Sequence, residues 1–168
     1  VEEKVDRVYL ASRTEVKEDN MDDFYKGCKK VEELLEGTGI PWTILRMGFS
    51  MESFLLGTKS TLSEGLFKFQ LGKDETIDPI TLDDFAESCA CVLLTEGHGY
   101  TTYNLCGKTK VSGNDVAEAL SSILRKDVKY QEISGEEMQK MCNDSKTPKW
   151  ELQEVFHLLE NLKERKEV

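Results

Sequence analysis

Two side chains able to share acid–base chemistry stand four residues apart, at Tyr25 and Lys29. Residues at this spacing lie on one face of a helix, so a helix through both would place them side by side. The tyrosine hydroxyl would then donate or accept a proton, and the neighbouring ammonium group would lower the pKa of the tyrosine. The alternative for the same pattern is structural, with Tyr25 at the edge of the core and Lys29 in solvent.

A thiol lies between these two residues, at Cys28. A buried cysteine usually behaves as a small inert hydrophobic residue, whereas a thiol that faces a ligand cleft is open to redox chemistry. The cysteine count is odd and the spacings suggest no disulfide framework, which indicates a reducing, cytoplasmic location. The sequence has no CxxC and only two histidines, so we expect no metal site. The five cysteines are Cys28, Cys89, Cys91, Cys106 and Cys142.

The 168 residues contain no glycine-rich turn of the kind that brings backbone amide groups up to a pyrophosphate. Gly37-Thr38-Gly39 and Gly97-His98-Gly99 both lack a third glycine, and the first of them ends a predicted helix instead of beginning one. We therefore expect any dinucleotide fingerprint to lie outside these residues.

A predicted helix over residues 21–36 positions Tyr25, Cys28 and Lys29. Apolar residues at 21, 24, 28, 31 and 35 follow helical spacing and predict a stripe that faces a core, with Cys28 directed inward. Glycines and a proline end this helix, and Trp42–Leu45 then predicts a short buried strand. With a strand predicted over Val5–Ser12, these elements form a crossover that joins two parallel strands.

Functional residues are expected where these two strands end, because ligands bind beyond the carboxyl ends of the strands in an open α/β sheet. Ser12 ends the first strand, and residues 47–54 leave the second. In that loop Gly48 would allow close approach of a flat ring, and Phe49 could stack on it. The alternative is ordinary packing beneath later helices.

Helices and strands alternate along the rest of the chain. A Ser or Thr followed three positions later by Asp or Glu predicts helix starts at Thr81, Ser112 and Ser134, and Thr147-Pro148 predicts another. The predicted helices cover residues 54–62, 81–94, 112–125, 135–142 and 148–165, and the predicted strands cover 66–70, 76–80, 100–106 and 128–133.

The composition is that of a globular protein, with 39% hydrophobic residues and a net charge of −10 from 22 basic and 32 acidic residues. Binding to phosphate backbones needs clustered Lys and Arg, so we expect no nucleic-acid partner. No apolar run approaches membrane-spanning length, so we expect no membrane partner either.

Three segments in order resemble the NmrA-like family of atypical short-chain dehydrogenase/reductases. The segment GTGIPWTILRMGFSMES at residues 37–53 is similar to the family pattern SG(L/I)PYT(I/L)LRPGFFMEN. TIDPITLDDFAESCACVLLTEGHGYTTYNLCG at residues 76–107 and VSGNDVAEALSSILRKDVKYQEISGEEM at residues 111–138 continue the resemblance.

The resemblance implies an α/β fold: the last strands of a Rossmann-type parallel sheet over residues 1–50, then one substrate-side α/β subdomain over residues 51–168. The nucleotide-binding half would lie upstream of Val1, so NAD(P)(H) would bind only with that half present. The implied function is an oxidoreductase acting on a small carbonyl or quinone-like acceptor. The alternative is a non-catalytic NAD(P) sensor that binds and regulates another protein. A sheet that lacks its other strands is expected to self-associate through its open edge.

The same resemblance implies site residues. Ser12 occupies the position of a Ser or Thr that would polarise the acceptor, and Met47, Gly48 and Phe49 occupy the segment that would lie against the nicotinamide. The positions where relatives carry Tyr and Lys fall on Phe24 and Cys28, one residue before Tyr25 and Lys29, and one residue turns a helix by about 100°. The candidate catalytic residues are Ser12, Tyr25 and Lys29, and the candidate cofactor-binding residues are Ser12, Cys28, Met47, Gly48 and Phe49.

Overall fold

A computed structural model describes residues 5–17 and 23–143 of the chain. The helix predicted over residues 148–165 lies outside this described part. The contacts divide the chain into two compact units, Val1–Ser50 with Ile80–Gly107 and Met51–Pro79 with Lys108–Val168. We expected residues 51–168 to form one unit. The structure differs because Ile80–Gly107 returns to the first unit and adds a helix and a strand to it.

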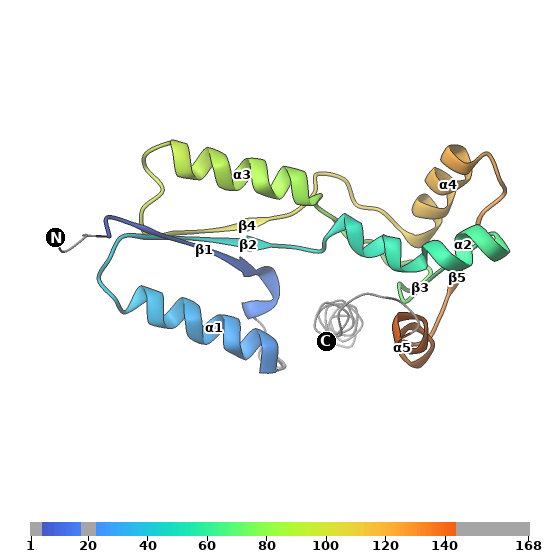
Figure 1. The fold of residues 1–168 in the computed structure, drawn as a ribbon, viewed down its shortest axis with the longest axis horizontal. Helices are drawn as coiled ribbons and strands as arrows, with labels where there is room; N and C mark the ends of the chain where they lie inside the picture. The colour runs from blue at the N-terminus through green and yellow to red at the C-terminus, as the bar shows by residue number, and fades with distance from the viewer. Residues whose placement is uncertain (1–4, 18–22, 144–168) are drawn as a thin grey trace. The chain divides into compact units, whose positions relative to one another are not determined.

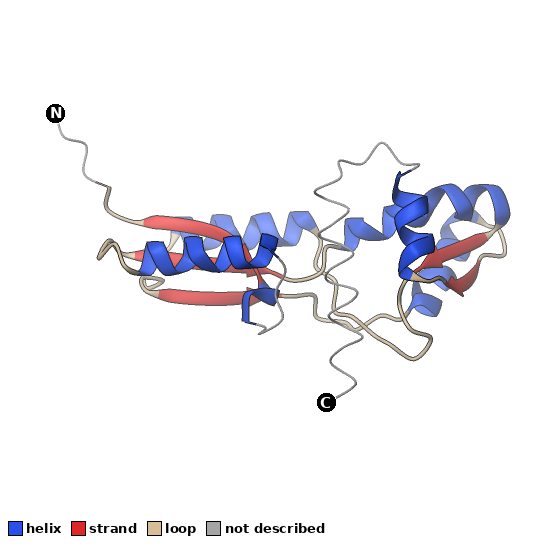
Figure 2. Cartoon of the chain, turned by 90° about the horizontal axis from the view of Figure 1, so that it is seen from below, coloured by secondary structure: helices blue, strands red, loops and turns tan. Residues whose placement is uncertain are grey.

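The first unit is built on a parallel sheet with the strand order β1-β2-β4. Helix α1 connects β1 to β2, and α3 precedes β4. Figures 1 and 2 show these two helices on opposite faces of the sheet. The predicted α/β class and the parallel crossover are confirmed. The bounds are β1 Val8–Arg13, a short 3-10 helix η1 Thr14–Lys17, α1 Asp23–Glu36, β2 Trp42–Met47, α3 Leu82–Leu94 and β4 Thr101–Leu105.

The core of the first unit is centred on β2, which has strands on both sides. Its apolar residues Ile44, Leu45 and Met47 are buried, as expected for a central parallel strand that is covered on both faces. Thr43 is also buried, and its hydroxyl donates to the carbonyl of His98 at 2.7 Å. The predicted buried strand over Trp42–Leu45 is therefore confirmed.

Helix α1 does not bury the apolar stripe that its spacing predicts. Phe24 is 43% exposed and Val31 is 49% exposed, whereas Tyr25, Glu32 and Leu35 are buried. The physical reason is a charged contact, because Glu32 pairs with a strand arginine and therefore faces the sheet. The prediction that the stripe as a whole faces a core was wrong.

The second unit contains a two-stranded parallel sheet of β3 and β5. A strand predicted over residues 76–80 is not formed, and isolated bridges join Ile77 to Val111 and Ile80 to Ser50. Pro79 has no N–H to continue such a ladder. The bounds are the 3-10 helix η2 Met51–Gly57, α2 Thr58–Glu64, β3 Leu66–Phe69, α4 Gly113–Leu124, β5 Lys129–Glu132 and α5 Gly135–Asn143.

The helix starts predicted at Thr81, Ser112 and Ser134 are confirmed by their capping bonds. Ser112 and Asp115 form a reciprocal capping box, and hydrogen bonds from Ser112 hold the pKa of the Asp115 carboxyl below its usual value. Ser134 accepts from the backbone N–H of Glu137 at 3.2 Å, and Thr81 opens α3 in the same way. These side chains satisfy N–H groups that a helix leaves without partners at its first turn.

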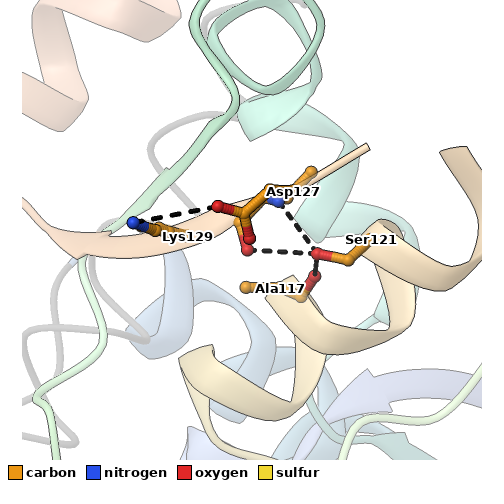
Figure 3. Close-up of polar contacts among 5 residues, drawn as sticks. Ala117, Ser121, Asp127 and Lys129 are labelled. Carbon is orange, nitrogen blue, oxygen red and sulfur yellow. Dashed lines mark hydrogen bonds and ion pairs between the residues drawn. The ribbon is translucent and has the colours of Figure 1, made fainter. Parts of the chain in front are cut away.

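Helix α4 is tied to β5 through Ser121 (Figure 3). The Ser121 hydroxyl accepts from the backbone N–H of Val128 at 2.9 Å, and the carbonyl oxygens of Ala117 and Val128 lie 2.9 and 3.1 Å away as acceptors for its proton. The exposed ion pair between Lys129 and Asp127 lies beside this cluster. Ser121 therefore fixes the short turn between α4 and β5.

Tyr130 of β5 connects the strand to the segment that follows β3. Its hydroxyl contacts the carbonyl oxygens of Phe69 and Leu71 and accepts from the N–H of Leu71 at 3.3 Å. A Cβ at Gly113 would lie 2.5 Å from the ring, so only glycine fits there. Burial raises the pKa of Tyr130 to about 12.

The first prediction concerns Tyr130→Phe, which leaves the backbone groups of Leu71 without their hydroxyl partner. We expect a loss of about 1–2 kcal/mol in the free energy of unfolding at neutral pH, measured by denaturant titration. The folded pKa lies above the ordinary value of about 10, so this contribution is complete below about pH 10 and is lost as the pH rises towards 12.

The difference between the two proteins should accordingly shrink over that pH range. The control is Tyr100→Phe, because Tyr100 is exposed, and its effect should stay within about 0.5 kcal/mol. An equal effect of the two substitutions would contradict the role assigned to Tyr130.

Candidate functional site

A pocket of about 430 Å³ lies between the carboxyl end of β1 and the first turns of α1. The strand provides one wall and the helix the other, and most of the lining is apolar. The lining residues are Leu10, Ala11, Ser12, Asp23, Phe24, Gly27, Cys28 and Val31. This is the end of a parallel strand at which ligands bind in open α/β sheets.

Ser12 supplies the polar group of the strand wall. It is 8% exposed, and its buried hydroxyl oxygen has no hydrogen-bond partner among the residues that the structure describes. Ser12 is in register with Arg46 of β2, whose side chain reaches α1, so the Ser12 side chain also faces the helix. A buried hydroxyl without a partner costs free energy, and a ligand that accepts its proton would remove that cost.

The helix wall combines a ring, a backbone surface and a thiol. Phe24 is partly exposed and meets the Tyr25 ring edge-on, with 5.3 Å between the ring centroids. A Cβ added at Gly27 would have nothing within 4 Å, so the wall is open there. Cys28 is half-buried and in the thiol form. The pocket therefore suits a flat, largely apolar molecule with a hydrogen-bond acceptor.

The structure brings Ser12 and Cys28 into one pocket and leaves Tyr25 and Lys29 outside its lining. Tyr25 is 1% exposed, in the core, and Lys29 is exposed. This is the structural alternative for the Tyr-Lys pattern. Phe24 and Cys28, each one position earlier on the helix than Tyr25 and Lys29, line the pocket in their place.

The predicted cofactor-binding residues Met47, Gly48 and Phe49 do not line this pocket either. Met47 follows Arg46, so its side chain lies on the opposite face of the sheet from Ser12. The Gly48 N–H donates to the carbonyl of Leu105 at 2.8 Å, and a Cβ at Gly48 would lie 3.2 Å from that oxygen. Glycine at this position therefore lets the backbone approach the end of β4 closely, whereas the sequence predicted a close approach to a ligand ring. Phe49 is buried.

One charged pair that we did not predict positions the helix wall. Arg46 donates to Glu32 from Nε at 3.0 Å and from Nη2 at 2.5 Å, and the two side chains are 13% and 4% exposed. A charged residue within the apolar run of β2 and an opposite charge on the preceding helix were the available signals. Two-pronged Arg–carboxylate contacts fix orientation as well as distance.

Within residues 5–17 and 23–143, no group of three or more His, Cys, Asp or Glu side chains could hold a metal ion. In the same part of the chain, none of the helices has the length and apolar content needed to cross a membrane.

Comparison with known proteins finds two reductases to which part of the chain is similar. No family model matches it. It is 31% identical to quinone oxidoreductase 2 of Escherichia coli strain K12 over 105 residues, 62% of this chain and 36% of that protein. It is 28% identical to NAD(P)H azoreductase of Xenophilus azovorans over 106 residues, 63% of this chain and 37% of that protein.

The fold is similar to the crystal structure of triphenylmethane reductase from Citrobacter sp. complexed with NADP(H). The TM-score is 0.80 at 22% identity, over 94% of this chain and 55% of that chain. The predicted fold class is confirmed, because the chain matches part of a Rossmann-type NAD(P)-binding fold. The chain spans about half of that structure and little more than a third of the two curated relatives.

The second prediction concerns the Ser12 hydroxyl, which has no hydrogen-bond partner within residues 5–17 and 23–143. We expect Ser12→Ala to change the free energy of unfolding by less than about 0.5 kcal/mol or to raise it, because no hydrogen bond is lost. The matched control is Ser121→Ala, which removes a bonded hydroxyl and should cost about 1–2 kcal/mol. Stability is measured by thermal and denaturant unfolding. If Ser12→Ala lost as much stability as Ser121→Ala, Ser12 would have a structural hydrogen-bond partner.

The third prediction concerns the buried ion pair. Arg46→Met leaves the Glu32 carboxylate buried and uncompensated, so we expect a loss of about 3–5 kcal/mol in denaturant unfolding. Arg46→Met combined with Glu32→Met should recover most of this loss, because no charge remains buried. The control is Lys68→Met, which breaks the more exposed pair with Glu64 and should cost under about 1 kcal/mol. Failure of the double substitution to recover stability would contradict this assignment.

Proposed function

We propose that this protein is an NAD(P)H-dependent oxidoreductase of the NmrA-like type that reduces a quinone-like acceptor at the Ser12 pocket. The observation that carries the proposal is the buried Ser12 hydroxyl, which the described part of the chain leaves without a partner, in an apolar pocket at the end of a parallel strand. The similarity to a quinone oxidoreductase and to an azoreductase supports the same class of reaction.

The residues present fit one end of a nicotinamide cofactor. The apolar walls and the Ser12 hydroxyl suit the nicotinamide and the acceptor, and bound NAD(P)H would supply a hydride there. The pyrophosphate needs backbone amides in a glycine-rich turn, which these 168 residues lack. We propose that residues outside this chain hold that end, and that they add a strand to the outer edge of β1. Within the described residues that edge pairs with no strand.

In this proposal the Ser12 hydroxyl donates a hydrogen bond to the acceptor oxygen on which negative charge develops. A donor aimed at developing charge in a site that excludes water is the commonest large catalytic contribution. Leu10, Phe24 and Val31 provide the apolar surroundings that make this bond effective. Met47, Gly48 and Phe49 would support the end of β4 behind this site, not contact the cofactor directly.

The acceptor class follows from the ionisable groups of the pocket. Among the lining residues that the structure describes, only Asp23 and Cys28 ionise, and neither Tyr25 nor Lys29 is available as an acid there. Hydride transfer to an aliphatic carbonyl gives an alkoxide, which needs a proton at once. Transfer to a quinone gives a phenolate, whose pKa of about 10 lets it leave as an anion or take its proton from water. The pocket therefore favours quinones over simple ketones.

The regulatory alternative, a sensor that binds another protein, receives no support from the two reductase relatives. The sensor alternative rests on Phe24 and Cys28, which occupy the positions where the family carries Tyr and Lys. The quinone proposal accounts for the same observation, because this acceptor class does not require the missing acid.

The fourth prediction tests the proposal with the complete protein, NADPH and 2-methyl-1,4-naphthoquinone, followed by the absorbance of NADPH. We expect turnover with the quinone, little with cyclohexanone, and a fall in kcat of roughly 100-fold for Ser12→Ala. Ser88→Ala, which removes a hydroxyl on the exposed surface of α3, is the control and should leave kcat unchanged.

Two results would contradict the proposed site. Equal reduction of the ketone would remove the argument for a quinone acceptor. Loss of turnover in Tyr25→Phe but not in Ser12→Ala would return the chemistry to the Tyr-Lys pair.

A further inference from the structure

The pocket holds a nucleophile that the proposed reduction does not use. Cys28 lines the pocket as a thiol, and the Ser12 hydroxyl lies in the lining of the same pocket. Ser12 is more than nine-tenths buried, and no described residue is a hydrogen-bond partner of its hydroxyl oxygen, so the pocket contains a donor for a ligand oxygen. A thiol and a donor in one apolar pocket are the two groups that addition to a conjugated carbonyl requires.

We propose that Cys28 is a covalent attachment site for quinones and related conjugated carbonyl compounds that enter the Ser12 pocket. The proposal rests on the proposed function, because it takes the same class of acceptor as its ligand. It goes beyond that function because it assigns to the chain a modification that needs no cofactor.

The addition is balanced without an oxidant or a reductant. The Cys28 sulfur, as thiolate, forms a bond to the ring carbon that is β to one of the two quinone carbonyls. The electron pair of the ring double bond moves through the conjugated system to the oxygen of that carbonyl, which takes a proton in place of the one that the thiol lost. The proton on the newly bonded ring carbon then moves to the other oxygen, and the product is a thioether of the hydroquinone.

Ser12 would accelerate this addition by donating to the oxygen that gains charge. A net hydrogen bond of about 1–1.5 kcal/mol to that oxygen corresponds to roughly tenfold in rate. Reduction and addition would also compete, because the hydroquinone formed with NADPH has no electrophilic ring carbon. When NADPH is present, reduction of the quinone would protect Cys28 from the addition. When NADPH is absent, the addition would leave the quinone attached to Cys28 and block the pocket.

The other described cysteines provide internal comparisons. Cys91 and Cys106 are exposed, so their rates report the reactivity of an accessible thiol. Cys89 is half-buried like Cys28, and burial raises the pKa of its thiol, so it should react slowly. Selective reaction at Cys28 would therefore have to come from its pocket, not from exposure.

The experiment treats the full chain with substoichiometric 1,4-benzoquinone, and in parallel with iodoacetamide, without NADPH. Peptide mass spectrometry then gives the rate at each cysteine. We expect the ratio of the Cys28 rate to the Cys91 rate to be roughly tenfold higher with benzoquinone than with iodoacetamide, because only the quinone uses the Ser12 hydrogen bond. Ser12→Ala should bring the two ratios together and leave the iodoacetamide rate at Cys28 unchanged.

A second variant keeps the test independent of Ser12. Gly27→Leu fills the open part of the helix wall, and leucine is a better helix former than glycine, so the variant should fold. It should lower the benzoquinone rate at Cys28 at least several-fold and leave Cys91 unchanged.

Equal ratios for the two reagents in the unaltered chain, or no effect of Gly27→Leu, would overturn the proposal. These outcomes are separate from turnover with NADPH. Turnover without selective labelling would leave the oxidoreductase standing and remove the attachment site. Selective labelling of Cys28 without turnover would keep the attachment site and contradict the proposed oxidoreductase.

Discussion

The ion pair between Glu32 of α1 and Arg46 of β2 sets the rotation of the helix on which the pocket depends. Both side chains are almost wholly buried, so separating them would leave a charge inside the unit. Each step of four residues turns a helix by about 40° beyond a full circle. With Glu32 directed at the sheet, Cys28 is turned partly away and Phe24 further still. Their burial follows this order, from buried Glu32 through half-buried Cys28 to exposed Phe24.

This rotation explains why the pocket contains a phenyl ring and a thiol, and why the Tyr-Lys pair lies elsewhere. Turning α1 by one residue would bring Tyr25 to the pocket, but it would also take Glu32 away from Arg46. The chemistry available at the pocket is therefore a consequence of the ion pair. Among the described lining residues, what remains there is a hydroxyl donor, a thiol, the Asp23 carboxyl group and apolar walls.

Much of the fold could be predicted from local patterns. The apolar run of β2 and the Ser-x-x-Asp and Ser-x-x-Glu caps of α4 and α5 are sequence signals that act over a few residues, and each is present in the structure. Ser12 was also predicted from such a pattern, because it ends a predicted strand, and the structure places it in the lining of a pocket. The strand expected near Ile77 failed for a reason that is local too, since Pro79 cannot extend a ladder.

The sequence by itself thus determined the parallel α/β class and most helix and strand positions. The tertiary structure decided which face of α1 is buried, that Met47 and Ser12 lie on opposite faces of the sheet, and that Ile80–Gly107 joins the first unit. Periodicity and capping depend on neighbours within one or two helical turns. Helix rotation and strand partners depend on contacts between elements, such as Arg46 with Glu32 across 14 residues or Thr43 with His98 across 55. These contacts exist only once both elements are in place, so no pattern within either element could specify them.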